Sequence, residues 1–281
     1  MLLSIIIVHF NQSENLRQCL DSIKKANLNF SFEIIIIDNS SNLGTVFANA
    51  FPLSRINKAF SNEISKFEEI PSIRIISNKK NVGFAKAVNQ GIKTAKGKYI
   101  LILNPDVSVE QNSIQALISF LNNNPKVGLV GPALYYPNGK LQYSARRFPS
   151  PVVLAIHRTF LKKTKWGQKK LNYYYYGDKD LTRPFPVSWI LGAALMVRAS
   201  ALKDTGLMNE KFFLYFEDID WAHHFWQNNW EVYYFPQAKV VHSYQRLSDK
   251  GGLLRSVFSP IFWIHLSSAI KYFLIYGIKP R

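Results

Sequence analysis

The stretch Tyr99-Ile-Leu-Ile-Leu103, followed at once by Asn104-Pro105-Asp106, decides the fold class of this chain. Every residue of the run is apolar, as is typical of a strand buried on both faces of a parallel sheet. A carboxylate therefore stands where such a strand ends. Because ligands of open α/β sheets bind outside the carboxyl ends of the strands, we expect Asp106 to face a metal ion or a phosphate.

Outward from this run, apolar strands alternate with amphipathic helices through the first half of the chain. That order predicts an α/β fold with a Rossmann-like, mostly parallel central sheet flanked by helices. The segment 42–70 is longer than a simple crossover needs and leaves room for an extra helix. The expected strands are 3–8, 32–37, 73–77 and 99–103, and the expected helices are 13–26 and 84–95.

The pattern changes after Val127, where shorter apolar runs alternate with turn residues. Tyr136-Pro-Asn-Gly139 lies between two such runs and predicts a hairpin, so we expect a mixed, partly antiparallel second half. Residues 162–180 mix lysines and tyrosines without apolar periodicity, which predicts a mobile loop or lid. Ordered structure is expected again at 187–197.

The C-terminal residues 261–276 have the pattern of an amphipathic helix. We expect Phe262, Leu266, Ala269, Ile270 and Phe273 on its apolar face, and His265, Ser268 and Lys271 on another. A spanning helix needs ~20 predominantly apolar residues, so this one is expected to lie in a membrane surface. The alternative is a helix packed on its own domain or on a second subunit in a homodimer.

The charge of the chain is strongly asymmetric. The formal net charge is +17, and no acid occurs between Glu110 and Asp178. Such a block favours a polyanion or an anionic surface as partner, although a solvated loop has the same composition. A nucleic-acid-binding protein is the rival interpretation, but acids at strand ends have no use on a phosphate-binding face. The cations in this stretch are Arg146, Arg147, Arg158, Lys162, Lys163, Lys165, Lys169 and Lys170.

Composition places the chain among globular proteins of a reducing compartment. Its 281 residues are 47% hydrophobic, which is ample for a core. The single cysteine, Cys19, excludes an internal disulfide framework. Met1 runs directly into an apolar strand without a basic leader segment, so we expect a cytoplasmic protein.

Two further acidic sites follow apolar runs. Glu217-Asp218-Ile219-Asp220 closes the run Phe212-Phe-Leu-Tyr-Phe216, and this setting shifts the pKa values of carboxyl groups and suits a general base. Asp38 ends the strand 33–37, where it can accept a hydrogen bond from a base imide or a ribose hydroxyl. A turn or helix cap is the plainer interpretation of Asp38. We expect Asp38, Asp106 and Asp218 to converge in one crevice.

In their order along the chain, these motifs resemble the inverting family 2 glycosyltransferases of GT-A fold, and above all the rhamnosyltransferase-like branch that builds bacterial surface polysaccharides such as the O-antigen of lipopolysaccharide. The resemblance covers about residues 3–245. It rests on Val8-His9-Phe10-Asn11, Ile37-Asp38-Asn39-Ser40, Asn81-x-Gly83-Phe84-Ala85 with Asn89-x-Gly91, Leu103-Asn104-Pro105-Asp106, Gly192-Ala193, and Phe216-Glu217-Asp218-Ile219-Asp220.

The resemblance implies a nucleotide-binding half (1–106), an acceptor-binding half (107–245) and a helical extension (246–281). It implies a nucleotide-sugar donor, Mg²⁺ or Mn²⁺, and a lipid-linked saccharide acceptor at the inner face of the cytoplasmic membrane. The leading donor is dTDP-L-rhamnose, with UDP-hexoses or UDP-GlcNAc as the alternative. The implied donor-binding residues are Val8, His9, Asn11, Asp38, Asn81, Gly83, Asn89, Asn104 and Asp106.

The resemblance also assigns the chemistry. Asp218 matches the catalytic base, Asp106 the last acid of the metal-binding D-x-D motif, and His242 a histidine that completes the metal and diphosphate site. Asn104 replaces the first acid of that motif, so we expect metal binding to rest on fewer charges. His223 and His224 are expected to be structural, because consecutive helical residues point about 100° apart. The implied acceptor-binding residues are Trp189, Gly192, Ala193, Glu217, Arg146 and Arg147.

Overall fold

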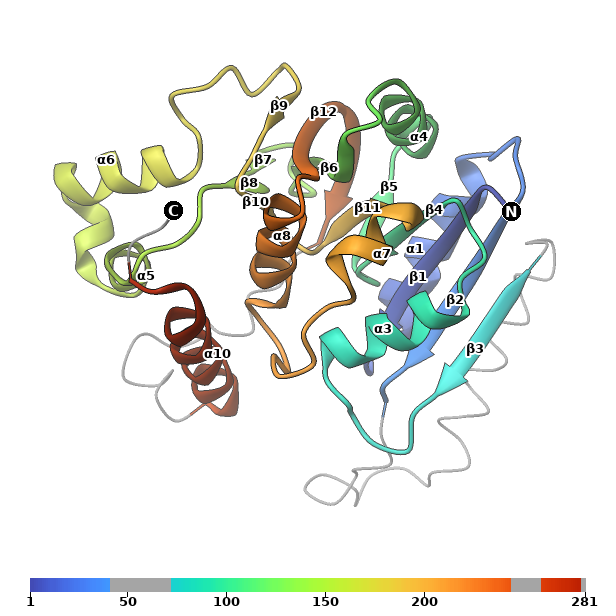
Figure 1. Cartoon of the computed structure of the whole chain (residues 1–281), viewed down its shortest axis with the longest axis horizontal. Coiled ribbons are helices and arrows are strands. Elements are labelled where there is room, and N and C mark those ends of the chain that lie inside the picture. Colours follow the sequence, from blue (N-terminus) through green and yellow to red (C-terminus); the bar gives the residue numbers. More distant parts are fainter. Residues whose placement is uncertain (41–71, 244–258, 279–281) are drawn as a thin grey trace.

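A computed structural model describes residues 1–40, 72–243 and 259–278 (Figure 1). These residues form a ten-stranded mixed sheet with the order β3-β2-β1-β4-β11-β6-β12-β5, in which β7 and β9 pair with β6 and β12. The extra helix expected within 42–70 lies outside the described residues.

The first half is the predicted parallel sheet. Strands β1 (Leu3–His9), β2 (Phe32–Asp38), β3 (Ile73–Ser77) and β4 (Tyr99–Leu103) run parallel, with β1 paired to both β2 and β4. The connecting helices are α1 (Ser13–Lys25) and α3 (Phe84–Thr94). The predicted strands and helices of this half are therefore confirmed to within one residue at each end.

The second half extends the same sheet with mixed pairing. β11 (Ala194–Arg198) lies antiparallel between β4 and β6 (Val127–Tyr135), and β12 (Glu231–His242) is parallel to β6. The predicted hairpin is present, since β6 turns through residues 136–139 into β7 (Leu141–Gln142). The short strands are β5 (Val107–Val109), β8 (Ala145–Arg146), β9 (Phe185–Pro186) and β10 (Trp189–Ile190), with β8 paired to β10 apart from the main sheet.

Helices cover both faces of the sheet, and the sheet divides the hydrophobic core into two layers. On one face, α1 and α4 (Ser113–Asn123) belong to the same core layer as the odd-numbered residues of β1. On the other, α3, α8 (Glu217–Gln227) and α10 (Pro260–Tyr276) belong to the layer of its even-numbered residues Ile6 and Val8. This alternation follows from the two-residue period of a strand, and it explains why β1 and β4 are apolar at nearly every position.

The prediction of a mobile loop over 162–180 is wrong. The segment continues from α5 (Pro151–Arg158) through a 3₁₀ turn, η1 (Phe160–Lys163), into α6 (Lys165–Tyr174). Thr159 and Thr164 cap these turns, because their hydroxyls accept the backbone N–H groups of Leu161 and Gly167. Two short helices with local caps need no long apolar stripe, so periodicity did not reveal them.

The predicted faces of the C-terminal helix are also corrected. α10 buries Ser268, Ala269 and Tyr272, whereas Ile270 and Leu274 are 53% and 81% exposed. Ser268 Oγ donates to the Leu214 carbonyl, and this bond lets a polar residue occupy the buried face. Within the described ranges, α10 included, no helix has the length and apolarity that crossing a membrane requires.

Candidate active site

A cavity of about 630 Å³ lies at the carboxyl edge of β4, enclosed by the start of α8, by α5 with η1, and by α10. Its volume is in the range of small-molecule sites. It brings together residues that are distant in sequence. The predicted site residues that line it are Asn104, Arg146, Trp189, Gly192, Ala193, Glu217, Asp218 and His242.

Asp218 sits at the N-terminus of α8 and is held from two sides. The Gly192 N–H donates to Oδ2 at 2.9 Å, and the Ile219 N–H donates to Oδ1 at 2.9 Å. The turn before the helix places Tyr215 and Phe216 at positive φ (69° and 70°), a conformation that costs energy for such residues and clusters at functional sites. The backbone thus aims Asp218 into the cavity.

The protonation of Asp218 suits proton transfer near neutral pH. Burial raises its pKa from 3.8 to about 6, against the opposing effects of the Gly192 hydrogen bond and the positive charge of Arg146. A general base works best with a pKa near the operating pH. Burial and then the charge of Asp218 also raise the pKa of Glu217 well above its ordinary value.

Gly192 and Ala193 couple this base to the end of β4. An added Cβ at Gly192 would lie 3.2 Å from Asp218 Oδ2, tighter than most Cβ contacts, so glycine lets the amide approach the carboxylate. Next to it, the Ala193 carbonyl accepts the Asn104 N–H at 2.9 Å. The predicted Gly-Ala pair therefore joins the base to the strand end that carries Asn104.

Asp106 and His242 meet, as the sequence predicted. β5 pairs with the end of β12 so that Val107 is opposite His242, and this register brings Asp106 Oδ1 to 3.4 Å from His242 Nε2. His242 Nδ1 lies 2.7 Å from Gln142 Oε1. An amide oxygen only accepts, so Nδ1 donates its hydrogen to Gln142, and this bond orients the ring so that Nε2 faces Asp106.

This pair fits a divalent cation that is completed by substrate. A carboxylate oxygen and an imidazole nitrogen are both common ligands of such ions, and here they face one another at 3.4 Å. In the described part of the chain no group of three His, Cys, Asp or Glu side chains is placed to hold a metal. Mg²⁺ is commonly held by one or two protein ligands together with phosphate oxygens and water.

Asp38 lies at the same sheet edge but does not line the cavity. Its Oδ1 accepts from His9 Nδ1 at 3.0 Å and from the Ser40 N–H at 2.9 Å, and His9 Nε2 in turn accepts the Gln12 N–H. Although burial opposes it, the hydrogen bonds from His9 and Ser40 hold the pKa of Asp38 below its ordinary value. Of the three aspartates expected in one crevice, only Asp218 lines the cavity; Asp106 lies behind its wall, in contact with the lining residue His242, and Asp38 lies outside it.

The remaining donor-side predictions fall on structural positions. Val8 is buried in the core, and the Asn11 N–H donates to Ser40 Oγ. Asn81 Oδ1 accepts the Gly83 N–H and shapes the turn into α3. Asn89 is buried and its side chain bonds both backbone groups of Met208, so it anchors a distant loop.

The two adjacent arginines have different surroundings. Arg146 lines the cavity, with its guanidinium 5.1 Å from the Trp189 ring. Arg147 does not line it. That side chain forms a bidentate pair with Asp178 and stacks on Tyr173. Trp189 is buried and donates to the Arg147 carbonyl, so it serves packing as well as the cavity wall.

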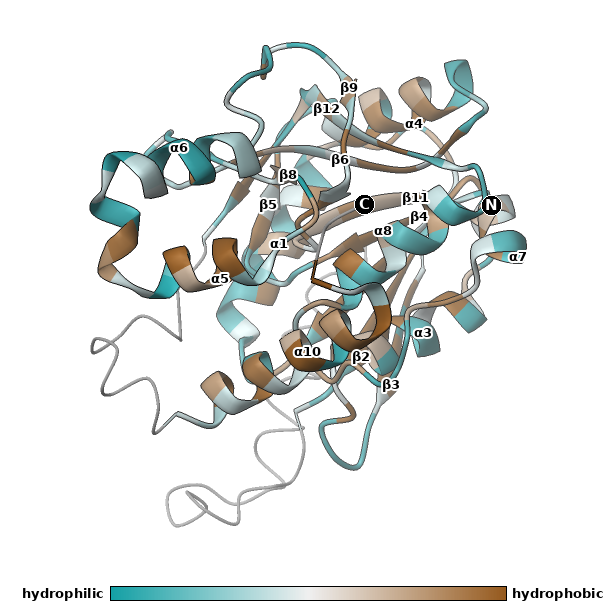
Figure 2. Cartoon of the chain, turned by 60° about the vertical axis from the view of Figure 1, so that its left-hand side comes forward, coloured by the Kyte–Doolittle hydropathy of each residue, from teal (hydrophilic) through white to brown (hydrophobic). Residues whose placement is uncertain are grey.

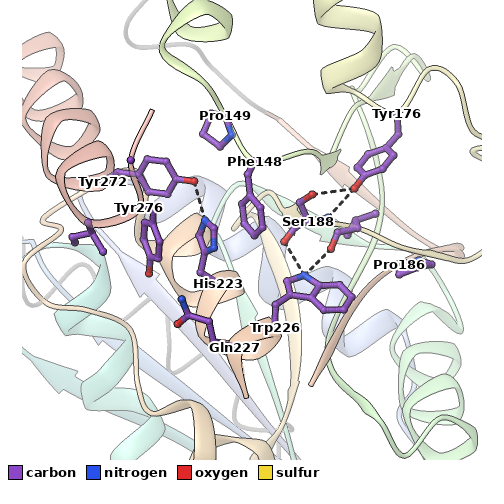
Figure 3. Close-up of a pocket in the computed structure, with 13 residues that line it drawn as sticks. Phe148, Pro149, Tyr176, Pro186, Ser188, His223, Trp226, Gln227, Tyr272 and Tyr276 are labelled. Atoms are coloured by element: carbon purple, nitrogen blue, oxygen red, sulfur yellow. Dashed lines mark hydrogen bonds between the residues drawn. The ribbon is translucent and has the colours of Figure 1, made fainter. Parts of the chain in front are cut away.

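His223 has the structural setting that was expected for it (Figure 3). The His223 ring stacks between Phe148 and Tyr276, at centroid distances of 3.6 and 3.9 Å, and Nε2 bonds Tyr272 Oη. Burial, then the charge of His224, lowers the pKa of His223 to about 4. A neutral, sandwiched ring locks α10 onto the helix that carries Asp218.

Sequence reasoning missed residues that support the site from afar. Gln142 orients His242 from β7, and Tyr276 Oη donates to Asp220 Oδ1 at 2.9 Å from α10. Both contacts join segments far apart in the chain. No local motif carries them, although a polar residue buried in an apolar hairpin, as Gln142 is, is a usable signal.

This fold and site define a glycosyltransferase of GT-A fold: a parallel sheet whose carboxyl edge holds a carboxylate–imidazole pair, facing a buried carboxylate across one cavity. A family model described as glycosyl transferase family 2 matches residues 4–206. The chain belongs to this family, and the predicted resemblance is confirmed.

Relatives and solved structures agree with this assignment. An N-acetylglucosaminyl-diphospho-decaprenol L-rhamnosyltransferase from Mycobacterium tuberculosis is 26% identical over 251 residues, covering 85% of this chain and 75% of that protein. Rhamnosyltransferase WbbL from Escherichia coli K12 is 25% identical over 189 residues, covering 66% of this chain and 65% of that protein. The crystal structure of GalNAc-T7 with UDP, GalNAc and Mn²⁺ shares the fold, with a TM-score of 0.68 and 17% identity. The match covers 98% of this chain and 48% of that one.

Proposed function

We propose that this protein is a metal-dependent, inverting rhamnosyltransferase that moves L-rhamnose from dTDP-L-rhamnose to a saccharide on a polyprenyl diphosphate, in the synthesis of O-antigen or a related surface polysaccharide. The observation that carries the proposal is Asp218, a buried carboxylate with a pKa of about 6 in a cavity shared with Asn104 and His242. The names of two relatives support the sugar and the lipid-linked acceptor.

In the proposed reaction Asp218 accepts the proton of the acceptor hydroxyl. The hydroxyl oxygen forms a bond to the anomeric carbon while the bond to the nucleoside diphosphate breaks, so the anomeric configuration inverts in one step. Glu217, whose pKa is raised by burial and by the charge of Asp218, hydrogen-bonds an acceptor oxygen in this proposal. Trp189, Gly192, Ala193 and Arg146 form the walls around that acceptor.

The donor occupies the sheet edge in this proposal. Asp38, kept ionised by His9, binds the imide of the base, with residues 8–11 as the floor. Asp106 and His242 hold Mg²⁺ or Mn²⁺, with Gln142 fixing the imidazole. When bound, the ion neutralises the charge that develops on the diphosphate leaving group.

The protein is proposed to act in the cytoplasm, peripherally on the inner face of the cytoplasmic membrane. α10 exposes apolar side chains, among them Trp263 (56%), Ile270 and Leu274. Figure 2 shows hydrophobic bands on α10 and on the neighbouring α5. The cations between 146 and 170 add attraction to anionic headgroups, at ~1 kcal/mol per residue near the surface.

The experiment that tests the function is a transfer assay with a donor panel. The purified protein is incubated with Mn²⁺, N-acetylglucosamine on a short prenyl diphosphate, and dTDP-L-rhamnose, UDP-glucose, UDP-galactose or UDP-GlcNAc in turn. Mass spectrometry is expected to find product with dTDP-L-rhamnose, and NMR to find the inverted linkage. A higher kcat/KM with any UDP-sugar contradicts the rhamnose assignment, and a retained configuration contradicts the role of Asp218.

A further inference from the structure

The cavity divides the basic stretch of the chain into two groups. Of its eight cations, only Arg146, Arg158 and Lys162 line the cavity, whereas the neighbouring Lys163 and Lys165 do not. Attraction to an anionic surface does not by itself require cations that line the cavity. This placement indicates a specific anion within the cavity.

Arg146 interacts with the part of the cavity wall that includes Asp218. Its guanidinium stacks on Tyr175 and Trp189, at 5.4 and 5.1 Å from the ring centroids, and its charge lowers the pKa of Asp218. Among the described lining residues, both carboxylates, Glu217 and Asp218, stand at the N-terminus of α8. Arg158 and Lys162 come instead from α5 and η1, so they supply positive charge from a different part of the cavity wall.

The corner that carries these two cations is held rigidly. Thr159 lies between α5 and η1, donating to the Ala155 carbonyl and accepting the Leu161 N–H. The guanidinium of Arg158 lies 5.1 Å from the Phe262 ring of α10. The backbone corner and the Arg158 guanidinium are thus positioned before an anion binds, which lowers the entropy that binding costs.

The side of the cavity identifies the anion. α8 lies between α5 and the strands β1, β2 and β4, at whose edge the donor is proposed to bind (Figure 1). Inversion requires the acceptor oxygen to attack the anomeric carbon on the face opposite the leaving group, and a base that takes its proton must stand on that face. Because Arg158 and Lys162 line the same cavity as Asp218, the anion that reaches them belongs to the acceptor.

We propose that Arg158 and Lys162 form a binding site for the diphosphate of the lipid-linked acceptor, with the guanidinium as the bidentate ligand and the ammonium as a point charge. This inference rests on the proposed function. The saccharide then spans from this site to Asp218, and the prenyl chain leaves past the exposed Phe160 (76%) and the apolar residues of α10. The spacing between this site and Asp218 therefore selects acceptors in which the same distance separates the diphosphate from the reacting hydroxyl.

The test compares Lys162→Ala with Lys163→Ala, a control next to it in sequence that is exposed but outside the cavity. Two acceptors carry the same saccharide, one on farnesyl diphosphate and the other on an uncharged alkyl chain. Lys162→Ala is expected to raise KM for the diphosphate acceptor about tenfold or more, and to leave KM for the uncharged acceptor and for the donor unchanged. Arg158→Gln is expected to act in the same way.

Other outcomes overturn the proposal. If the variants raise KM for the donor, Arg158 and Lys162 bind the donor's diphosphate instead. If the Lys162 and Lys163 variants have equal effects, these cations act only as general surface charge. A parallel loss of binding to phosphatidylglycerol vesicles assigns them to bilayer headgroups. Calorimetry with farnesyl diphosphate alone tests this site independently of the proposed function. Weaker binding of farnesyl diphosphate by Lys162→Ala supports the site even if the protein transfers no sugar. If the protein transfers sugar but Lys162→Ala binds farnesyl diphosphate as the wild type does, the site is rejected and the proposed function is not.

Discussion

Replacing Asp218 by asparagine tests the proposed base with little change of shape. The amide oxygen of Asn can still accept the Gly192 N–H that now binds Oδ2, while its NH2 group replaces the oxygen that accepts the Ile219 N–H. The variant is therefore expected to fold and to bind donor with the affinity of the wild type. It lacks the carboxylate that takes the acceptor proton, and removing a general base typically costs 10²–10⁴-fold in rate.

The raised pKa of Asp218 sets the expected pH dependence. With a pKa of about 6, roughly 90% of the carboxyl is ionised at pH 7 and about 10% at pH 5. The kcat of the wild type is expected to fall about tenfold for each pH unit well below 6. The residual activity of Asp218→Asn is expected to lack this limb.

The same pKa predicts a gain of stability in the variant. Because the folded pKa lies above the unfolded value of 3.8, the folded state binds more protons between about pH 4 and pH 6, and stability falls as pH rises through that window. Above pH 6 the ionised carboxylate costs up to roughly 3 kcal/mol. Asp218→Asn is expected to recover part of this cost at pH 8 and none at pH 4.

Three measurements check this reasoning. Steady-state kinetics from pH 5 to 8 give kcat, calorimetry gives donor affinity, and urea unfolding at pH 4 and 8 gives stability. Glu217→Gln is the matched control, because the pKa of Glu217 is raised well above its ordinary value and Gln resembles its protonated form. Turnover by Asp218→Asn within tenfold of the wild type would refute the assignment, as would equal stability changes at both pH values.

Other contacts give further predictions. Gln142→Leu frees the His242 ring to rotate and is expected to weaken Mn²⁺ binding in the presence of dTDP by about 10–100-fold, measured by electron paramagnetic resonance; unchanged affinity would remove Gln142 from the metal site. Tyr276→Phe removes the hydrogen bond to the buried Asp220 and is expected to cost about 1–3 kcal/mol in urea unfolding, with Tyr173→Phe, an exposed position, as the control.

Much of the nucleotide-binding half was predictable because its signals are local. Period-two alternation of buried faces, as in β1 and β4, depends only on residues within one strand, and so does the place where a strand ends. Asp38 and Asp106 were located at the sheet edge for this reason. Family motifs added the identity of Asp218, whose placement in the cavity with His242 agrees with the role proposed for it.

Three features escaped because they depend on partners elsewhere in the chain. The helices of 160–174 are stabilised by threonine caps and by packing on α5, without an apolar stripe. Arg146 and Arg147 look equivalent in sequence, yet successive side chains of an extended segment point to opposite sides, and only Arg146 reaches the cavity. The buried face of α10 was decided by hydrogen bonds from Ser268 and Tyr276.

The sequence by itself determined the parallel strands, the acids at their carboxyl ends and the family, since these features depend on residues that are close together in the sequence. Only the tertiary structure decided which polar groups meet. His242 with Gln142, and Arg158 with the cavity of Asp218, are joined by strand register and helix packing over long separations in the chain. Such contacts are chosen by burial and hydrogen bonding of the whole fold, and no local pattern specifies them.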